Sequence, residues 1–295
     1  MLIAIVAALA AAGSFAAGGV LQQRAASTRP EKEALSFRLV LDLLHEPMWL
    51  LGMGFAFLSY VLEGIALSFG PLVLVQPLIV TELLFALPIS VRWRGMTMGW
   101  REWTGTVSVA GGLTVGLVSA APGAGRPEAP IGEWALALAI VGAMTLLAVS
   151  GGRRYRGPGR SSLYALGAAT VLGAQAALFK AAVARFQNGI AAGFGSWETW
   201  AMFTAAILGL VLVQSAYEAG PLAASMPVLD AVDPTVAVAF GIVLFHEHIR
   251  TGAWVAGVAA GIALLVAGIA LLDTSPLVQN LQRMESQQRR SPTAA

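Results

Sequence analysis

The chain alternates between long apolar stretches and shorter polar segments. Nine apolar stretches are each long enough to cross a bilayer as a helix, and they cover residues 2–21, 48–69, 71–91, 103–120, 131–149, 161–184, 197–218, 221–245 and 252–273. A hydrocarbon core about 30 Å thick is crossed by about 20 apolar residues, and tilt accommodates a few more. The pattern therefore predicts an all-α membrane protein with nine transmembrane helices.

Two polar segments stand apart from these stretches. Residues 25–47 carry many charged side chains, and within them 34–44 has the pattern of a short amphipathic helix on the membrane surface. Residues 274–295 are rich in Gln, Arg and Ser, and they are predicted to form a polar cytoplasmic tail. A signal peptide is the alternative interpretation of the first stretch. No Lys or Arg precedes that stretch, however, and its apolar run is longer than a usual signal sequence.

The basic residues lie mostly on one side of the predicted membrane. With nine spans, 14 of the 18 Lys and Arg residues fall on one side and three on the other, while Lys180 lies within a span. Short loops rich in Lys and Arg stay in the cytoplasm. The asymmetry predicts a multi-pass protein of a bacterial-type inner membrane, with the N-terminus outside and the C-terminus in the cytoplasm.

Composition narrows the classes of function. Hydrophobic residues make up 57% of the chain and charged residues 12%, whereas soluble domains hold about 25% charged residues. The absence of cysteine excludes disulfides, thiolate metal sites and cysteine nucleophiles. The pI near 9.3 follows from the cytoplasmic loops, so no nucleic-acid partner is expected. No phosphate-binding G-x4-G-K-[ST] loop occurs, so neither ATP nor another cofactor is expected.

An internal repeat links the two halves of the chain. Gly70–Pro77 and Gly220–Pro227 share the pattern G-P-L-x4-P, and each follows an apolar span with almost no loop. Glycine permits the tight turn, and proline fits the first turn of the next helix. The second proline lies at membrane depth and is expected to kink its helix. Four prolines are therefore candidate hinges: Pro71, Pro77, Pro221 and Pro227.

The repeat also predicts the domain organisation. Trp103 with Gly105 and Gly112 is similar to Trp254 with Gly257 and Gly261. We expect a first repeat over 1–120, a linker helix over 131–149, a second repeat over 161–273 and the tail over 274–295. Because the repeats are five spans apart, the second is inverted relative to the first, as in many secondary transporters.

The residues that carry the repeat resemble the drug/metabolite transporter superfamily and its duplicated EamA-type unit. The nine-span count is similar to the NIPA-type magnesium-transporter branch. The segment from Ala66 to Leu78 resembles that branch's F-A-P-A-x-L-V-T-P-L segment, and Trp49 with Gly52 resembles its W-x-x-G opening. The branch's Gly-Glu pair aligns with Ser59 and Tyr60, and Glu63 stands where the branch has Asn. The resemblance implies a membrane carrier and, for this branch, Mg²⁺ as the cargo.

Acidic residues at membrane depth are the main candidates for a substrate site. Glu82 lies eleven residues past Pro71, which is about 16 Å along a helix. Asp230 and Asp233 share one helix face in the equivalent span. Such charges cost about 2.5–3.5 kcal/mol to insert, so they mark functional sites. We expect these three carboxylates to form one central site for a cation, with Mg²⁺ as one alternative. Kinks after Pro77 and Pro227 and a break before Pro234 would supply carbonyl ligands.

Other polar residues within the spans are candidates for substrate binding or for contacts between helices: Tyr60, Glu63, Gln76, Gln175, Lys180, Gln214. The alternative for Lys180 is that it extends to the outer surface. His246-Glu247-His248 lies in a short external loop and lacks the spacing of a metal-binding helix. The glycine pairs Gly112/Gly116 and Gly257/Gly261 are expected to be helix-packing faces.

The sequence thus favours a secondary transporter and not an enzyme. The cargo is expected to be a cationic or small organic solute, moved by alternating access and coupled to protons in one alternative. A NIPA-like Mg²⁺ transporter is the second alternative. Two further interpretations are a structural subunit and a membrane enzyme that acts on a lipid phosphate. The expected partners are the solute and the lipid bilayer, and a homodimer is left open.

Overall fold

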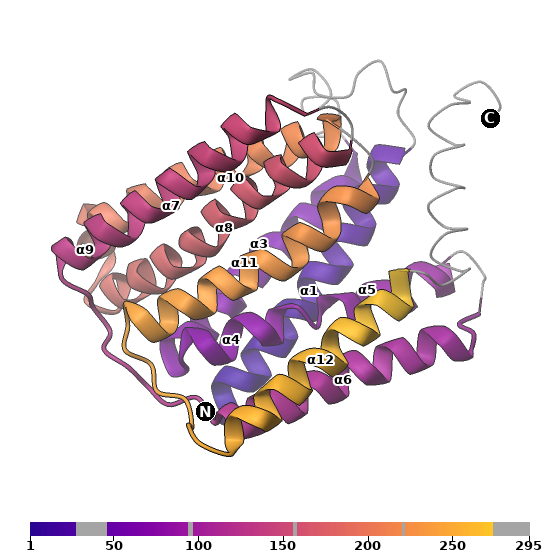
Figure 1. The fold of residues 1–295 in the computed structure, drawn as a ribbon, viewed down its shortest axis with the longest axis horizontal. Coiled ribbons are helices and arrows are strands. Elements are labelled where there is room, and N and C mark those ends of the chain that lie inside the picture. The colour runs from indigo at the N-terminus through magenta and orange to yellow at the C-terminus, as the bar shows by residue number, and fades with distance from the viewer. Residues whose placement is uncertain (28–45, 94–96, 156–157, 220–221, 274–295) are drawn as a thin grey trace. The chain divides into compact units, whose positions relative to one another are not determined.

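The computed structural model describes residues 1–27, 46–93, 97–155, 158–219 and 222–273 (Figure 1). Over these residues the secondary structure is helical, apart from one isolated bridge between Gly123 and His248. The first half of the chain forms α1 (Leu2–Ser27), α3 (Pro47–Phe69), α4 (Leu72–Ile79), α5 (Glu82–Trp93) and α6 (Trp100–Ala120). The remainder forms α7 (Ile131–Gly152), α8 (Pro158–Gln187), α9 (Ile190–Gly195), α10 (Trp197–Ala219), α11 (Leu222–Val243) and α12 (Trp254–Asp273).

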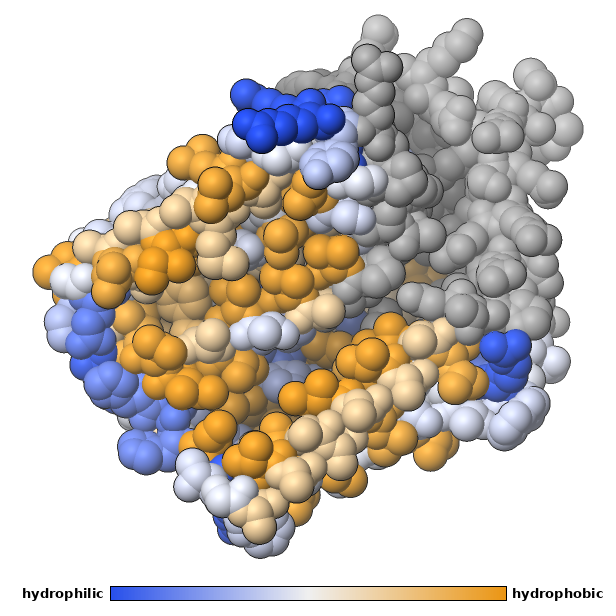
Figure 2. All heavy atoms as spheres, viewed as in Figure 1, coloured by the Kyte–Doolittle hydropathy of each residue, from blue (hydrophilic) through white to orange (hydrophobic). Residues whose placement is uncertain are grey.

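The helices have the length and surface of membrane spans. Six of them are long and apolar enough to cross a bilayer: α1, α3, α6, α7, α8 and α12. Large apolar side chains such as Phe57, Leu147 and Ile207 are more than half exposed, and Figure 2 shows hydrophobic residues along α7 and α12. Contact of so much apolar surface with water is unfavourable, whereas contact with lipid tails is not. An all-α membrane protein is therefore confirmed.

Three shorter apolar helical segments, Leu72–Ala86, Trp197–Val213 and Ala231–Val243, fall on the other predicted spans. The count of nine stays a prediction. The short helix α9 lies in the predicted external loop 185–196 and was not expected from the sequence. The predicted surface helix over 34–44 and the predicted tail lie outside the described residues.

The third predicted span is two helices and not one. Helix α4 ends at Ile79, and α5 begins at Glu82. Pro77 lies in the last turn of α4 and has no N–H to give to the ladder, which weakens the helix at this point. The chain then turns at Val80 and Thr81, and a new ladder begins with the bond from Leu84 N to Thr81 O, 2.9 Å. The interruption follows Pro77, where the sequence predicted a kink.

The prediction of a break before Pro234 is wrong. Helix α11 is continuous from Leu222 to Val243 and contains both Pro227 and Pro234. Its packing explains the continuity, because α11 lies tightly against α8. A Cβ placed on Gly173 of α8 would lie 2.6 Å from Val236 Cβ and 2.7 Å from Asp233 O. Neighbouring helices can hold a proline-containing helix together in this way.

The chain folds into two compact units that do not coincide with the two halves of the sequence. Unit 1 comprises Met1–Ala4, Gly64–Val80 and Pro122–Ile249, and unit 2 comprises Ile5–Glu63, Thr81–Ala121 and Arg250–Ala295. Each unit thus combines segments of both predicted repeats. The repeat boundaries and their inversion stay predictions.

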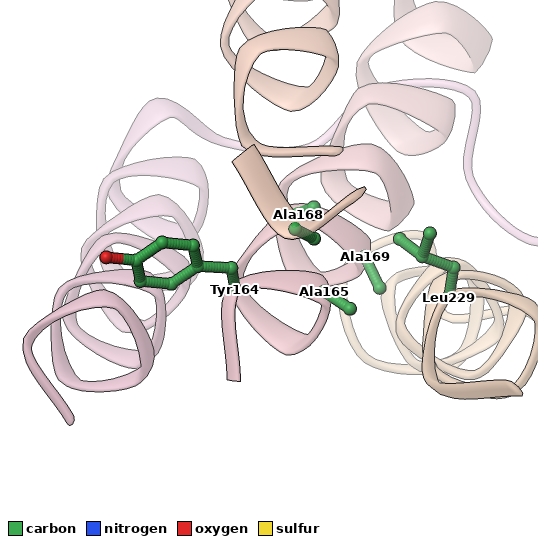
Figure 3. Packing of buried hydrophobic residues seen from close by; sticks show 6 residues of the cluster. Tyr164, Ala165, Ala168, Ala169 and Leu229 are labelled. Atoms are coloured by element: carbon green, nitrogen blue, oxygen red, sulfur yellow. The ribbon is translucent and has the colours of Figure 1, made fainter. Parts of the chain in front are cut away.

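The core of unit 1 is built around α8, which packs against α7, α10 and α11. Small side chains let the helices approach: in Figure 3, Ala165 and Ala169 point towards Leu229 of α11, while Tyr164 extends to the other side of α8. The Ser161 hydroxyl donates to Ala216 O of α10 across 2.8 Å. In lipid, helices usually associate through close approach of their backbones at small residues and through hydrogen bonds between helices.

In unit 2, helices α6 and α12 pack as an antiparallel pair through glycine (Figure 1). Low numbers on one helix lie against high numbers on the other, since Gly105 faces Gly268 and Gly112 faces Gly261. A Cβ on Gly112 would lie 2.5 Å from Leu265 N and 2.6 Å from Gly261 O. The prediction that these glycines form a helix-packing face is therefore confirmed.

Candidate functional site

The strongest polar cluster among the described residues lies in unit 1, where the loop after α11 meets the beginning of α4. Helix α11 ends at Val243, and His246 adopts a left-handed φ of 52°. Backbone bonds hold this turn, including Glu247 N to Gly241 O at 2.9 Å. The turn directs the Glu247 side chain into the protein, where it is 0% exposed.

Glu247 caps the N-terminus of α4. Its Oε1 accepts from Leu72 N at 2.7 Å, and its Oε2 accepts from Val73 N at 2.8 Å. The first N–H groups of a helix have no partner within it, and the helix dipole makes this end positive. Pro71 precedes the helix and gives it no side-chain cap. The Glu247 carboxylate, from the loop after α11, therefore takes the place of a local N-cap side chain.

Lys180 of α8 forms an ion pair with Glu247. The Lys180 side chain is 10% exposed, and its Nζ lies 4.4 Å from the centre of the Phe245 ring. Buried ions need a partner and several hydrogen bonds to offset lost hydration. The Glu247 carboxylate has an ion partner and two backbone hydrogen bonds. The face of the Phe245 ring adds a cation–π contact to the Lys180 ammonium. The cluster thus joins α4, α8 and the loop after α11.

The loop before α7 encloses this cluster. Arg126 binds the loop after α11 twice, by its backbone N to Phe245 O at 2.7 Å and by its Nε to Leu244 O at 2.8 Å, and it also pairs with Glu133. Gly241 leaves room for the carboxylate, because a Cβ there would lie 2.5 Å from Glu247 Oε2. The environment of Glu247 is therefore tightly specified.

A second ion cluster lies on the same unit. Arg185 Nη1 lies 2.8 Å from Glu128 Oε1, and Arg185 Nη2 lies 3.0 Å from Glu198 Oε1. These contacts join the end of α8, the loop before α7 and the first turn of α10. Together with the Glu247 cluster, they connect segments that the charge asymmetry predicts to lie on one side of the membrane.

The sequence identified Lys180 but not its partner. The alternative interpretation, in which Lys180 extends to the outer surface, is wrong. The Lys180 side chain is paired with Glu247 inside the protein. A role for Lys180 in substrate binding stays a prediction. The predicted topology places Lys180 near the outer end of its span and Glu247 in an external loop on the same side, but a shared side alone does not identify a pair.

The predicted carboxylates of the shared site belong to different units. Glu82 opens α5 in unit 2 and is partly buried. Asp233 lies in α11 of unit 1 and is also partly buried, whereas the side chain of Asp230 lies outside the described set. The shared site therefore stays a prediction.

The other predicted site residues have varied surroundings. Gln76 of α4 is buried, Gln175 of α8 and Glu63 of α3 are partly buried, and Tyr60 of α3 is 49% exposed. The side chain of Gln214 lies outside the described set. Pro71 stands at the N-cap of α4, and Pro227 lies within α11, whereas Pro221 is not among the described residues. Their role as hinges stays a prediction.

No preformed cluster for a metal ion is found in the described part of the chain, counting groups of three or more His, Cys, Asp and Glu. The described part includes the His246-Glu247-His248 loop but not the side chain of Asp230. Binding of Mg²⁺ by Glu82, Asp230 and Asp233 therefore stays a prediction.

Comparison with known proteins gives a relative along nearly the whole length. The chain is 33% identical over 292 residues to an uncharacterized protein of Corynebacterium glutamicum, with 96% of this chain and 99% of the relative covered. No protein-family model and no solved structure matches. The chain belongs to the same family as this corynebacterial protein.

Proposed function

We propose that the protein is a secondary transporter of the drug/metabolite transporter type, which moves a cationic or small organic solute by alternating access. The observation that carries the proposal is the break between α4 and α5, which is followed at once by Glu82. Carriers commonly place substrate and ion sites at discontinuous helices near the middle of the membrane. A charge at such a depth is energetically costly, so Glu82 is a candidate for a functional residue.

The break interrupts the regular hydrogen-bond ladder of the predicted span. Helix α4 ends at Ile79, and Pro77 has no N–H to donate to the carbonyl group four residues before it. The Glu82 carboxylate stands in the first turn of α5. Carbonyl oxygens and a carboxylate are ligands suited to a cation, either an ammonium group or a metal ion.

The packing of equivalent helices supports inverted repeats. Helices α4 and α11 carry the two G-P-L-x4-P patterns, and the beginning of α4 meets the end of α11: a Cβ on Gly241 would lie 2.8 Å from Val73 Cγ2. Helices α6 and α12, which carry the Trp and Gly pattern, also run antiparallel. Equivalent helices of inverted repeats have opposite orientations in the membrane, and the contacts of these two pairs support such an arrangement.

The division into two units supports a rocking motion. The chain passes from one unit to the other between Glu63 and Gly64 and between Val80 and Thr81. Two candidate acidic residues, Glu63 and Glu82, therefore lie beside the connections that would bend when the units move. Alternating access in carriers with inverted repeats is largely a rigid-body motion of this kind.

The acidic residues favour a cationic cargo. Glu82 of unit 2 and Asp233 of unit 1 are both partly buried in apolar helices. A proton-coupled organic cation is the leading candidate because a carboxylate at membrane depth can bind either a proton or an ammonium group. The resemblance of Ala66–Leu78 to the NIPA-type segment keeps Mg²⁺ as the second candidate.

The test is a flux measurement with the full chain in liposomes. Radiolabelled organic amines and Mg²⁺ are supplied in turn, under an imposed pH gradient and then under an imposed voltage, with protein-free liposomes as the control. We expect amine flux that follows the pH gradient. Mg²⁺ uptake driven by voltage alone would select the second candidate, and no flux of any cation in correctly folded samples would exclude the transporter.

A further inference from the structure

An open pocket of about 410 Å³ lies in unit 1, where α7 ends and α8 begins, beside the last turns of α10. Its volume falls within the roughly 300–1,000 Å³ of ordinary small-molecule sites. The side chains that define it come from three helices and the turn between two of them: Val149, Arg153, Arg160, Tyr164, Leu212 and Ser215. This pocket is at the opposite end of α8 from the Glu247 cluster and has no part in the proposed transport.

The mouth of the pocket is basic. Arg153 follows the end of α7 and Arg160 lies in the first turn of α8, and both are exposed. The Arg160 guanidinium lies 5.1 Å from the centre of the Tyr164 ring, which orients it over the pocket wall. Among the described residues that line the pocket, no carboxylate opposes the two arginines. Two guanidinium groups that meet no carboxylate within the described lining favour an anion.

The inner wall of the pocket is apolar. Val149 and Leu212 contribute aliphatic side chains, and Tyr164 is buried, with its ring against Gly152. The outer faces of α7 and α10 next to the pocket carry exposed Leu147 and Val211. Figure 2 shows hydrophilic residues at the end of α7 directly beside hydrophobic surface. A ligand that fits both surfaces has an anionic head and apolar chains.

The position of the pocket along the membrane normal agrees with this chemistry. Arg153 and Arg160 belong to the loop 150–160, and the charge asymmetry predicts this loop to be cytoplasmic. Anionic phospholipids give the cytoplasmic leaflet its negative surface potential, and basic pockets between transmembrane helices bind their head groups. Arg pairs well with phosphate because its planar fork donates two parallel hydrogen bonds.

We propose that this pocket is a binding site for an anionic glycerophospholipid of the inner leaflet. Arg153 and Arg160 bind the phosphodiester, and an acyl chain follows the apolar wall formed by Val149 and Leu212. Bound in this way, one lipid connects the end of α7 with α8 and α10 and stabilises their packing. The proposal does not depend on the transported solute, so its outcome is separate from that of the flux measurement.

The test measures lipid binding to the purified full chain in detergent. Native mass spectrometry counts bound phosphatidylglycerol, and thermal unfolding with added phosphatidylglycerol gives the stabilisation. Phosphatidylcholine is the zwitterionic comparison, and inorganic phosphate tests for a soluble ligand. We expect phosphatidylglycerol alone to remain bound and to raise the Tm. Equal effects of phosphatidylcholine, or an equal effect of inorganic phosphate, would overturn the lipid site.

Matched variants locate the site. R153Q and R160Q are each expected to weaken phosphatidylglycerol binding by about fivefold, since a basic group near anionic lipid contributes about 1 kcal/mol. R154Q removes the same charge from the same turn but from outside the pocket, and it should bind as the parent does. Equal losses in all three variants would show non-specific attraction and overturn the proposal.

A variant that keeps both arginines tests the pocket itself. The Ser215 hydroxyl donates to Val211 O of its own helix, α10, at 2.8 Å, so its substitution removes no bond between helices among the described residues. Ser215→Phe fills the pocket and is expected to abolish bound phosphatidylglycerol, while the circular dichroism spectrum stays that of the parent. Undiminished binding by a folded Ser215→Phe protein would place the lipid elsewhere.

Discussion

At the scale of residues, Glu247 joins three segments of unit 1 through its carboxylate oxygens. Its two oxygens accept from the first two N–H groups of α4 and from Lys180, although 175 and 67 residues separate these partners from it in the sequence. Removing one member of a buried pair leaves an uncompensated charge and costs about 3–5 kcal/mol. Glu247 therefore fixes the beginning of the broken span.

We expect Glu247→Ala to lower the free energy of unfolding by about 3–5 kcal/mol, because Lys180 and two N–H groups lose their partner. Lys180→Met should cost less, because the carboxylate keeps its two backbone donors. Thermal and denaturant unfolding in detergent micelles measure both effects.

The double variant Lys180→Met/Glu247→Ala is the control for a specific pair. Its destabilisation should fall short of the sum of the single effects by about 0.5–3 kcal/mol, as for residues in direct contact. Strictly additive effects would show that the two side chains do not interact in the membrane-extracted protein.

The candidate acids could be found from the sequence, but the Glu247 cluster could not. Glu82, Asp233 and Lys180 are conspicuous because charge is rare within apolar stretches. Glu247 lies in a loop between two histidines, where a charge is ordinary. Its burial depends on the left-handed turn at His246 and on the space at Gly241, and neither is visible before the fold is known.

At the scale of elements, proline alone does not decide where a membrane helix breaks. Pro77 lies two residues before the end of α4, whereas Pro234 lies inside the continuous helix α11. The local rule for proline is the same at both positions. The difference comes from packing, since Gly173 lets α8 approach α11 beside Pro234. The sequence predicted correctly that the helix is distorted after Pro77 and wrongly that it breaks before Pro234, because tertiary contacts are absent from a local pattern.

The antiparallel pair α6 and α12 provides the second prediction. Gly112→Ala places a Cβ 2.5 Å from Leu265 N, which forces the two backbones apart. We expect a loss of about 1–3 kcal/mol, as for other overpacked positions. Thermal unfolding in detergent, followed by size-exclusion chromatography, measures it.

Gly111→Ala is the matched control, one residue away on the same helix. A Cβ there would meet only Leu264 Cδ2, at an ordinary 3.5 Å. Alanine is also the better helix former, by about 1 kcal/mol, so the Tm should hold or rise. Equal losses in both variants would mean that the glycine contacts do not set the distance between the helices.

At the scale of the whole molecule, the class of the protein was predictable and its division into units was not. Nine apolar stretches and the small number of charges were sufficient for an all-α membrane protein. The two units, however, each combine parts of both predicted repeats, such as α4 with α8 and α11 in unit 1. This combination of segments follows from contacts between residues far apart in the sequence. The periodicity of a single apolar stretch does not reveal such contacts.

The predicted topology can be tested directly because the chain contains no cysteine. Ala124 and Tyr155 are both exposed, in the loop before α7 and after the end of α7. We expect Ala124→Cys to react with a membrane-impermeant maleimide in intact cells, and Tyr155→Cys to react only after permeabilisation. The reverse pattern would invert the orientation, and labelling of both residues from outside would exclude α7 as a span.

The most direct test of the proposed function compares cation flux through three variants in liposomes. Glu82→Gln and Asp233→Asn each remove a negative charge from an apolar helix, whereas Glu128→Gln removes an exposed one from a loop. The account predicts that the first two reduce flux at least about tenfold, equivalent to 1.4 kcal/mol, while Glu128→Gln transports as the parent does. Parental flux through folded Glu82→Gln and Asp233→Asn proteins would contradict it.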